Sequence, residues 1–284
     1  MQTFPEFISF KLGIYVEIFV EWLLDNFMGF FEVLNKVILF CLLKVDSFLH
    51  WLPWWVLVLL VFFLGWRYKN LKSGIFYAFS LSLIGVFGLW ELTMSTLAIV
   101  LTSVALSLLL GLPIGIWMSY SAKVEVVVKP ILDAMQTMPS FVYLIPAMMF
   151  FGLGMVPAVF ATIVYALPPV IRLTNLGIKS VSREMVEAAY AFGSSSWQTL
   201  VKVQLPQALP TIMTGINQTT MMALSMVVIA SMIGVKGLGY EVLAGIGRIE
   251  IAQAFDAGLS IVILAIIIDR ITQGIADKYK IPEQ

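Results

Sequence analysis

Long runs without any charged side chain constrain this chain more than any other feature of its sequence. No Asp, Glu, Lys or Arg occurs in residues 94–120, 134–171 or 210–234. A helix needs about 20 mainly apolar residues to cross a bilayer, and each run is long enough. Charged residues make up 12% of the chain, about half of the roughly 25% that is usual in soluble domains. Because so few charges cannot cover a water-soluble surface, the sequence predicts an all-α integral membrane protein.

Hydrophobic length and turn signals together predict about seven transmembrane helices. They cover roughly residues 52–66, 74–90, 94–119, 134–152, 155–172, 209–234 and 257–272. Four tryptophans flank the first of these helices where aromatic belts meet the membrane interface: Trp51, Trp54, Trp55 and Trp66. We therefore expect an N-terminal segment in residues 1–50, two accessory transmembrane helices in 51–91, a membrane core in 92–275 and a tail in 276–284.

Residues 6–46 have a different pattern, because their polar residues recur at helical spacing on one narrow face. These are Lys11, Glu17, Glu21, Asp25, Glu32, Asn35 and Lys36. A thin polar stripe on an otherwise apolar helix suits an amphipathic helix that lies in the membrane interface or packs sideways against the spans. The alternative is an eighth span, which would move the N-terminus to the other side of the membrane.

The basic residues predict the orientation of the spans. If residues 187–206 face the cytoplasm, that side holds Arg67, Lys69, Lys72, Lys123, Lys129, Arg172, Lys179, Arg183, Lys202, Arg270, Lys278 and Lys280. The outer side then holds only Lys11, Lys36, Lys44, Lys236 and Arg248. Positive residues are enriched in cytoplasmic loops, so we expect the N-terminus outside and the C-terminus in the cytoplasm.

Several classes of function are disfavoured by what the chain lacks. One cysteine, Cys41, and one histidine, His50, exclude a disulfide framework and disfavour a Cys/His metal cluster. The net charge of zero indicates no nucleic-acid partner, and no phosphate-binding or hydrolytic motif occurs. The charged residues of the long spans fall at or near their expected ends: Glu91, Asp133, Arg172, Asp256, Asp269 and Arg270. This distribution argues against an ion-driven transporter, which needs ionisable groups inside the membrane.

The stretch SVSREMVEAAYAFGSSSWQTLVKVQLP, residues 180–206, predicts two short helices joined by a tight turn. Ser182 can cap the first helix, and Gly193 stands where a left-handed stop is favoured. Ser195 and Gln198 have the spacing of a capping box, and Pro206 is expected to end or kink the second helix. The first helix exposes Met185, Ala188, Ala189 and Phe192 along one side. This side suits docking to a partner, and the alternative is a helix that rests on its own protein or on the membrane.

The same stretch resembles the EAA loop of permease subunits in binding-protein-dependent ABC importers. The matching residues are Glu187, Ala188, Ala189, Gly193, Leu205 and Pro206, with Val203 where the family usually has isoleucine. Four further segments look like glycine betaine/proline betaine permeases: ILDAMQTMPSFVYLIPAMMFFGLGMVP, YALPPVIRLTNLGI, GINQTTMMALSMVVIASMIGVKGLG and IVILAIIIDRITQ. Together the match covers about residues 92–275.

The resemblance implies a five-helix core of the methionine-permease-like type I family, in a bacterial cytoplasmic membrane. It also implies a second copy of this chain, two cytoplasmic ATPase subunits that bind ATP and magnesium, and an external substrate-binding protein. In such importers the EAA loop supplies the coupling helix that contacts the ATPase, so Glu187, Ala188 and Ala189 belong to that contact. Gly193 belongs to the turn, and Leu205 with Pro206 to the return towards the membrane. This chain would be no enzyme and would hold no cofactor or metal.

The span that starts near Pro210 is the predicted lining of the pathway. It presents Asn217, Gln218, Thr219, Thr220 and Ser225, and the alternative role for these small polar residues is hydrogen bonding between helices. The expected cargo is a quaternary ammonium compatible solute used in osmoprotection. The alternative solutes are choline, carnitine and a sulfonate. The alternative class of function is a channel or scaffold that works without ATP. The chain ends at IPEQ soon after the last span, which predicts a receptor on a separate polypeptide, and no secretory signal peptide is recognisable.

Overall fold

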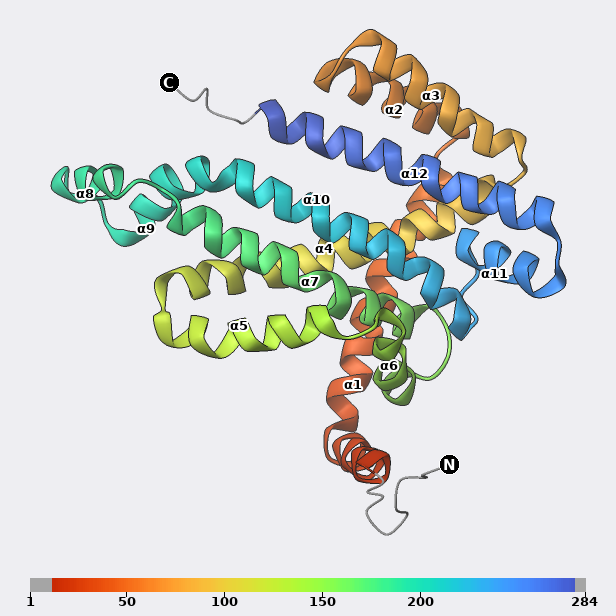
Figure 1. Ribbon diagram of the computed structural model, residues 1–284, viewed down its shortest axis with the longest axis horizontal. Coiled ribbons are helices and arrows are strands. Elements are labelled where there is room, and N and C mark those ends of the chain that lie inside the picture. Colours follow the sequence, from red (N-terminus) through yellow and green to blue (C-terminus); the bar gives the residue numbers. More distant parts are fainter. Residues whose placement is uncertain (1–11, 279–284) are drawn as a thin grey trace, which may run out of the picture.

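The structure is a computed structural model that describes residues 12–278, and within that range it is helical without any β-strand (Figure 1). Lys11, Lys280 and the rest of the predicted tail beyond Lys278 lie outside the described residues. The elements are α1 (Leu12–Trp51), α2 (Trp54–Tyr68), α3 (Leu71–Val86), α4 (Trp90–Tyr120), α5 (Ala122–Thr137), a 3₁₀ turn (Ser140–Tyr143), α6 (Leu144–Phe151), α7 (Met155–Lys179), α8 (Arg183–Ala191), α9 (Ser196–Thr199), a π turn (Leu200–Gln204), α10 (Leu205–Ala230), a 3₁₀ turn (Ser231–Ile233), α11 (Leu238–Arg248) and α12 (Ile251–Lys278).

Four helical segments are long and apolar enough to cross a membrane: α4, α7, the segment Ser196–Ile233 that contains α10, and α12. They confirm the predicted spans 94–119, 155–172, 209–234 and 257–272. The predicted spans 52–66 and 74–90 correspond to the shorter helices α2 and α3, which pack as a hairpin. The long helices place α8 at one end of the molecule and α11 at the other (Figure 1). We refer to these as the α8 end and the α11 end.

The predicted span over residues 134–152 is not one straight helix but part of a bent pair of helices. The chain bends by 112° between α5 and the segment that begins at Ser140. Pro139 explains the break, because a proline pushes the preceding residue out of the helical region, and Met138 has φ −72° and ψ 134°. Up to six spans result if each bent pair of helices is counted as one.

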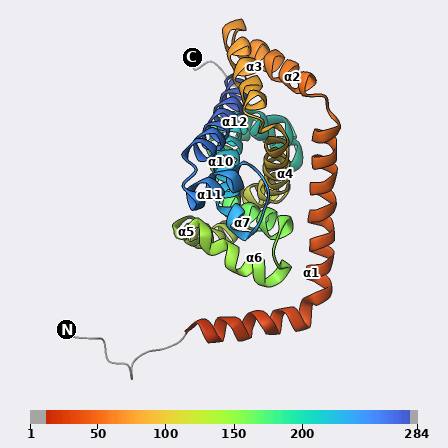
Figure 2. The same cartoon turned by 90° about the vertical axis from the view of Figure 1, so that its right-hand side faces the viewer.

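The N-terminal helix α1 crosses the bundle instead of running along it (Figures 1 and 2). It is kinked at Phe27, so the predicted polar face does not continue in one line along the whole helix. Its second half packs against α4, α6 and α7 and buries Ile38, Leu42 and Leu49. A helix packed sideways against the spans is one of the two placements predicted, and a position in the membrane interface stays a prediction.

Glycines bring the central helices into close contact. A methyl group added at Gly115 on α4 would lie 2.7 Å from Cβ of Thr174 and 2.8 Å from the carbonyl oxygen of Ile171, both on α7. Hydroxyls join the same helices, because Ser107 donates to the carbonyl of Ile163 at 3.4 Å. Small residues and hydroxyls of this kind hold helices together in a bilayer, where lipid is as apolar as the side chains.

We expect Gly115→Ala to destabilise the protein by about 1–3 kcal/mol, because the new methyl group overpacks the contact between α4 and α7. Gly258→Ala on α12 is the matched control, since nothing lies within 4 Å of the methyl group added there. Thermal unfolding in detergent measures both variants. A melting temperature for Gly115→Ala at or above that of the control would contradict the close contact.

Candidate functional site

The predicted helix, turn and helix of residues 182–199 are confirmed. The Ser182 hydroxyl accepts a hydrogen bond from the Met185 amide at 3.4 Å and so caps α8. Gly193 has a φ of +82°, a left-handed conformation that glycine adopts without strain. Ser195 and Gln198 form the reciprocal capping box, with bonds of 2.9 and 3.3 Å. Caps at both ends of the turn make α8 and α9 a defined unit.

The helix α8 buries none of its residues and stands at the tip of the α8 end (Figure 1). Met185 and Ala188 are exposed, Ala189 is half-buried, and Phe192 just after the helix is 92% exposed. An exposed aromatic ring and an exposed thioether are suited to fill a partner's groove, and alanine lets two helices approach closely. The exposed side of α8 therefore has the composition of a docking surface.

Glu187 on α8 forms an ion pair with Arg183, at 2.7 Å between Oε1 and Nε. Both side chains are largely exposed, and an exposed pair of this kind contributes only about 0–1 kcal/mol. Either residue can therefore change partner at little cost. The pair adds exposed charge of both signs next to the apolar side chains.

The loop that carries α8 is fixed to the long helices from behind. A small apolar cluster joins the end of α7, the π turn and the start of α10, and it consists of Ile178, Leu200, Ala208 and Ile212. The Tyr120 hydroxyl at the end of α4 donates to Oε1 of Gln204. Sequence reasoning missed this contact, which joins residues 84 positions apart. The loop thus has one side packed on three long helices and the other side free.

Of the two effects expected of Pro206, an end or a kink, the structure shows no end of the helix. The π turn Leu200–Gln204 precedes it, with the Leu205 amide bonded to the carbonyl of Leu200, and α10 continues from Leu205 to Ala230. A proline lacks an amide donor and clashes with the carbonyl four residues earlier. The wider π turn accommodates that clash. We call residues 182–204 the docking loop, after the composition of its exposed side. The second half of this loop is therefore joined to α10 by continuous helix.

The five predicted pathway residues divide into two groups on α10. Gln218 and Ser225 are exposed and share one face, since seven residues span about two helical turns. The Thr219 hydroxyl donates to the carbonyl of Ala166 on α7 at 2.9 Å, and Thr220 bonds within its own helix. Asn217 bonds to α12. For Thr219 and Asn217 the structure thus shows the alternative role, hydrogen bonding between helices.

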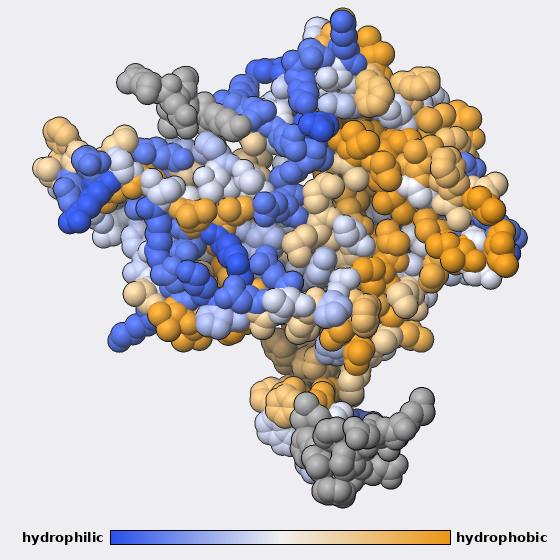
Figure 3. Space-filling model, in the orientation of Figure 1, coloured by the Kyte–Doolittle hydropathy of each residue, from blue (hydrophilic) through white to orange (hydrophobic). Residues whose placement is uncertain are grey.

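Polar contacts that the sequence did not indicate brace α7 just before α8. Arg172 on α7 pairs with Asp133 on α5, and Lys179 at the end of α7 lies 2.5 Å from Glu125. Asn175 donates to the same glutamate at 3.4 Å. Hydrophilic side chains also gather on this half of the surface, towards the α8 end, whereas hydrophobic ones dominate the other half (Figure 3).

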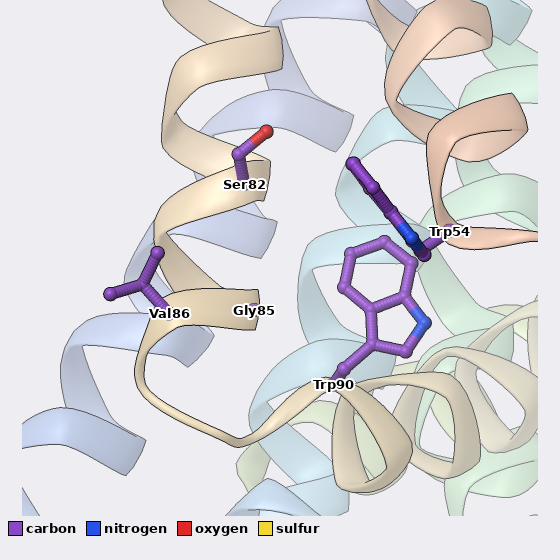
Figure 4. A pocket seen from close by; sticks show the side chains of 5 residues that line it. All are labelled: Trp54, Ser82, Gly85, Val86 and Trp90. Carbon is purple, nitrogen blue, oxygen red and sulfur yellow. The ribbon is translucent and has the colours of Figure 1, made fainter.

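A cavity of about 600 Å³ lies between α2, α3 and the start of α4. It is lined by Trp54, Ser82, Gly85, Val86 and Trp90 (Figure 4). The Ser82 hydroxyl donates to the carbonyl of Ala78 on its own helix, and the two tryptophans add indole N–H donors to the lining. The cavity belongs to the accessory hairpin and involves neither α8 nor the exposed face of α10.

Comparison with known proteins identifies the family. Residues 107–280 match the family model described as "Binding-protein-dependent transport system inner membrane component". The chain belongs to this family. It is 49% identical to the glycine betaine/carnitine transport permease protein GbuB of Listeria monocytogenes, over 97% of this chain and 99% of the relative. It is 46% identical to the glycine betaine/proline betaine transport system permease protein ProW of Escherichia coli, over 90% of this chain and 72% of the relative.

Solved structures agree on the fold. A chain of the MetNI methionine ABC transporter, in an inward-facing conformation, superposes with a TM-score of 0.61 at 23% identity. The match covers 70% of this chain and 97% of that chain. The predicted type I importer permease fold is thereby confirmed, and the protein is a multi-pass membrane permease.

We expect Gly193→Ala to loosen the docking loop, because a residue with a Cβ pays about 1–2 kcal/mol in the left-handed conformation. Nothing lies within 4 Å of the added methyl group, so the effect comes from backbone strain alone. Hydrogen exchange of residues 183–199 should accelerate while the global melting temperature changes little. Gly193→Asn is the control, since asparagine tolerates this conformation. Equal protection in both variants and in the parent would contradict this view of the turn.

Proposed function

We propose that this chain is the transmembrane permease subunit of an ATP-driven importer of quaternary ammonium compatible solutes, such as glycine betaine and proline betaine, in osmoprotection. The observation that carries the proposal is α8, a capped helix with no buried residue, whose sequence resembles the EAA loop, at one end of a membrane bundle. A helix mounted in this way is suited to transmit a partner's movement to the spans.

The partner at α8 is a cytoplasmic ATPase, present in two copies, which binds ATP and magnesium itself. Phe192 and Met185 would insert into a groove of that subunit, with Ala188 and Ala189 at the closest approach and Glu187 beside them. The α8 end then faces the cytoplasm, with the C-terminus on that side and the N-terminus outside. Closure of the ATPase pair would rock the spans through the continuous helix of the loop and α10, an alternating-access movement of packed elements.

A second copy of the chain covers the exposed face of α10. Gln218 would be unfavourable against lipid, because an amide in hydrocarbon needs partners, whereas the Ser225 hydroxyl on the same face donates to the carbonyl of Met221 at 3.1 Å. The amide is accommodated if two copies enclose a water-filled path between their α10 helices. The described part of this face is polar but uncharged, so strong recognition of the solute is expected in an external binding protein.

The cargo is inferred from the relatives and from the chemistry of that face. The names of the two relatives have glycine betaine in common. A betaine carries a carboxylate, which hydroxyl and amide groups can hydrogen-bond, and a methylated cation, which polarisable thioethers such as Met221 contact without cost. Carnitine shares both groups and is the competing solute.

The docking proposal predicts that Phe192→Glu and Glu187→Arg reduce co-purification of the cognate ATPase at least about tenfold, as expected when an anchor of an interface is lost. Insertion into the membrane should be unaffected, because both side chains are exposed. Glu250→Arg is the matched control, an exposed carboxylate at the α11 end. Normal co-purification of both variants would overturn the docking role.

The cargo proposal predicts uptake of labelled glycine betaine at high osmolarity by cells with the gene and none by cells without it. Unlabelled carnitine, choline and proline betaine serve as competitors, and their ranking identifies the preferred solute. If the assembled complex restores no uptake, betaine is removed as the cargo. Flux through the purified chain alone, insensitive to vanadate, would replace the importer with a channel.

A further inference from the structure

The last helix, α12, belongs to a second packing unit of the molecule. Its residues Ile263 and Ile267 pack with Tyr77, Leu81 and Ile84 of α3 in this second unit, whereas Leu264 on the same helix packs into the main core with α4, α7 and α10. A methyl group added at Gly274 would lie 3.2 Å from Cβ of Tyr68 at the end of α2. The accessory hairpin of α2 and α3 is therefore attached mainly to α12, and α12 is the least buried of the four long spans.

A polar contact adds to the apolar packing of α12 on α10. Asn217 of α10 donates its side-chain amide to Oδ1 of Asp269 on α12 at 2.8 Å. Gln273, one turn further along α12, donates to the same oxygen at 2.7 Å. The side chain of Asp269 is only 19% exposed, although Arg270 lies 3.7 Å from its other oxygen. Two amide donors thus hold the carboxylate in one orientation, directed at α10.

The position of this contact along α10 connects it to the docking loop. The helix α10 follows the π turn directly, so a displacement of α8 and α9 is passed along its axis to Asn217. Apolar packing between α10 and α12 is non-directional and tolerates sliding, whereas a hydrogen bond to a carboxylate is directional and strong. The contact therefore fixes the register of α12 on α10.

We propose that Asp269 is a positioning residue for transport: through Asn217 it makes α12, together with the α2–α3 hairpin, follow α10 when the docking loop moves. This inference rests on the proposed importer function. A role confined to folding would lower ATP hydrolysis and uptake together. Positioning predicts instead that loss of the contact lets the ATPase turn over without productive movement of the spans.

The test uses the complete complex of permease, ATPase and binding protein in proteoliposomes, with glycine betaine as the solute. We expect Asp269→Leu and Asn217→Asp to lower uptake about tenfold, which is the effect of one lost charge-assisted hydrogen bond. The rate of ATP hydrolysis should stay within about twofold of the wild-type rate. Asn217→Asp places two carboxylates against each other. The exchange variant Asn217→Asp/Asp269→Asn restores an amide facing a carboxylate, and should recover most of the uptake.

Thr272→Val is the matched control, because the Thr272 hydroxyl donates to the carbonyl of Ile268 on its own helix. Unchanged uptake per ATP in Asp269→Leu would overturn the proposal, and so would an exchange variant that remains uncoupled. A wild-type complex that hydrolyses ATP but moves no glycine betaine would instead count against the proposed cargo.

A measurement that does not depend on the cargo then tests the positioning role of Asp269. Spin labels at Lys202 in the docking loop and Lys72 on α3 report whether the docking loop and the α2–α3 hairpin move together. Their distance should be unchanged on vanadate trapping in the wild type and should change in Asp269→Leu. A distance that behaves identically in both overturns the positioning role.

Discussion

Close contact between helix backbones is the constraint on which the rest of this structure depends. Lipid gives no hydrophobic driving force between spans, so the helices are held by van der Waals contact and hydrogen bonds. Gly115 meets α7, a methyl group added at Gly215 on α10 would lie 3.0 Å from Cβ of Leu173 on α7, and one added at Gly177 on α7 would lie 3.1 Å from the carbonyl oxygen of Ala208 on α10. Because α7 is fixed on both sides, α4, α7 and α10 form one packed unit. The docking loop emerges from two of its members.

The docking loop is connected to long helices at both of its ends. The helix α7 precedes it, and the π turn leads into α10. Ion pairs from α5 brace α7 in its last turns, and the Tyr120 hydroxyl holds the π turn. A force on the exposed side of α8 therefore acts on the ends of the long helices α7 and α10. The π turn is the one irregular element between the loop and α10, and Pro206 gives the physical reason for it.

Local chemistry made the loop predictable from sequence, whereas contacts distant in the chain were not. Caps at Ser182 and Ser195 and the left-handed Gly193 depend on neighbours within three residues, and the structure confirms each of them. The break after Thr137 was also signalled by Pro139, but the apolar run that continues beyond it suggested a single span. The crosswise path of α1 and the bond from Asn217 to Asp269 depend on tertiary packing, for which one sequence carries no periodic signal.

The polar groups of α10 show how one helix serves two requirements. Thr219 and Asn217 direct hydrogen bonds to α7 and α12, although Oδ1 of Asn217 has no hydrogen-bond partner among the described residues. Gln218 and Ser225 occupy a different face and are exposed. If polar residues served only to hold helices together, they would all point at neighbouring helices of the same chain. The Ser225 hydroxyl donates to the carbonyl of Met221 on its own helix, so it is the exposed amide of Gln218 that needs a separate explanation. The water-filled path proposed between two copies supplies one.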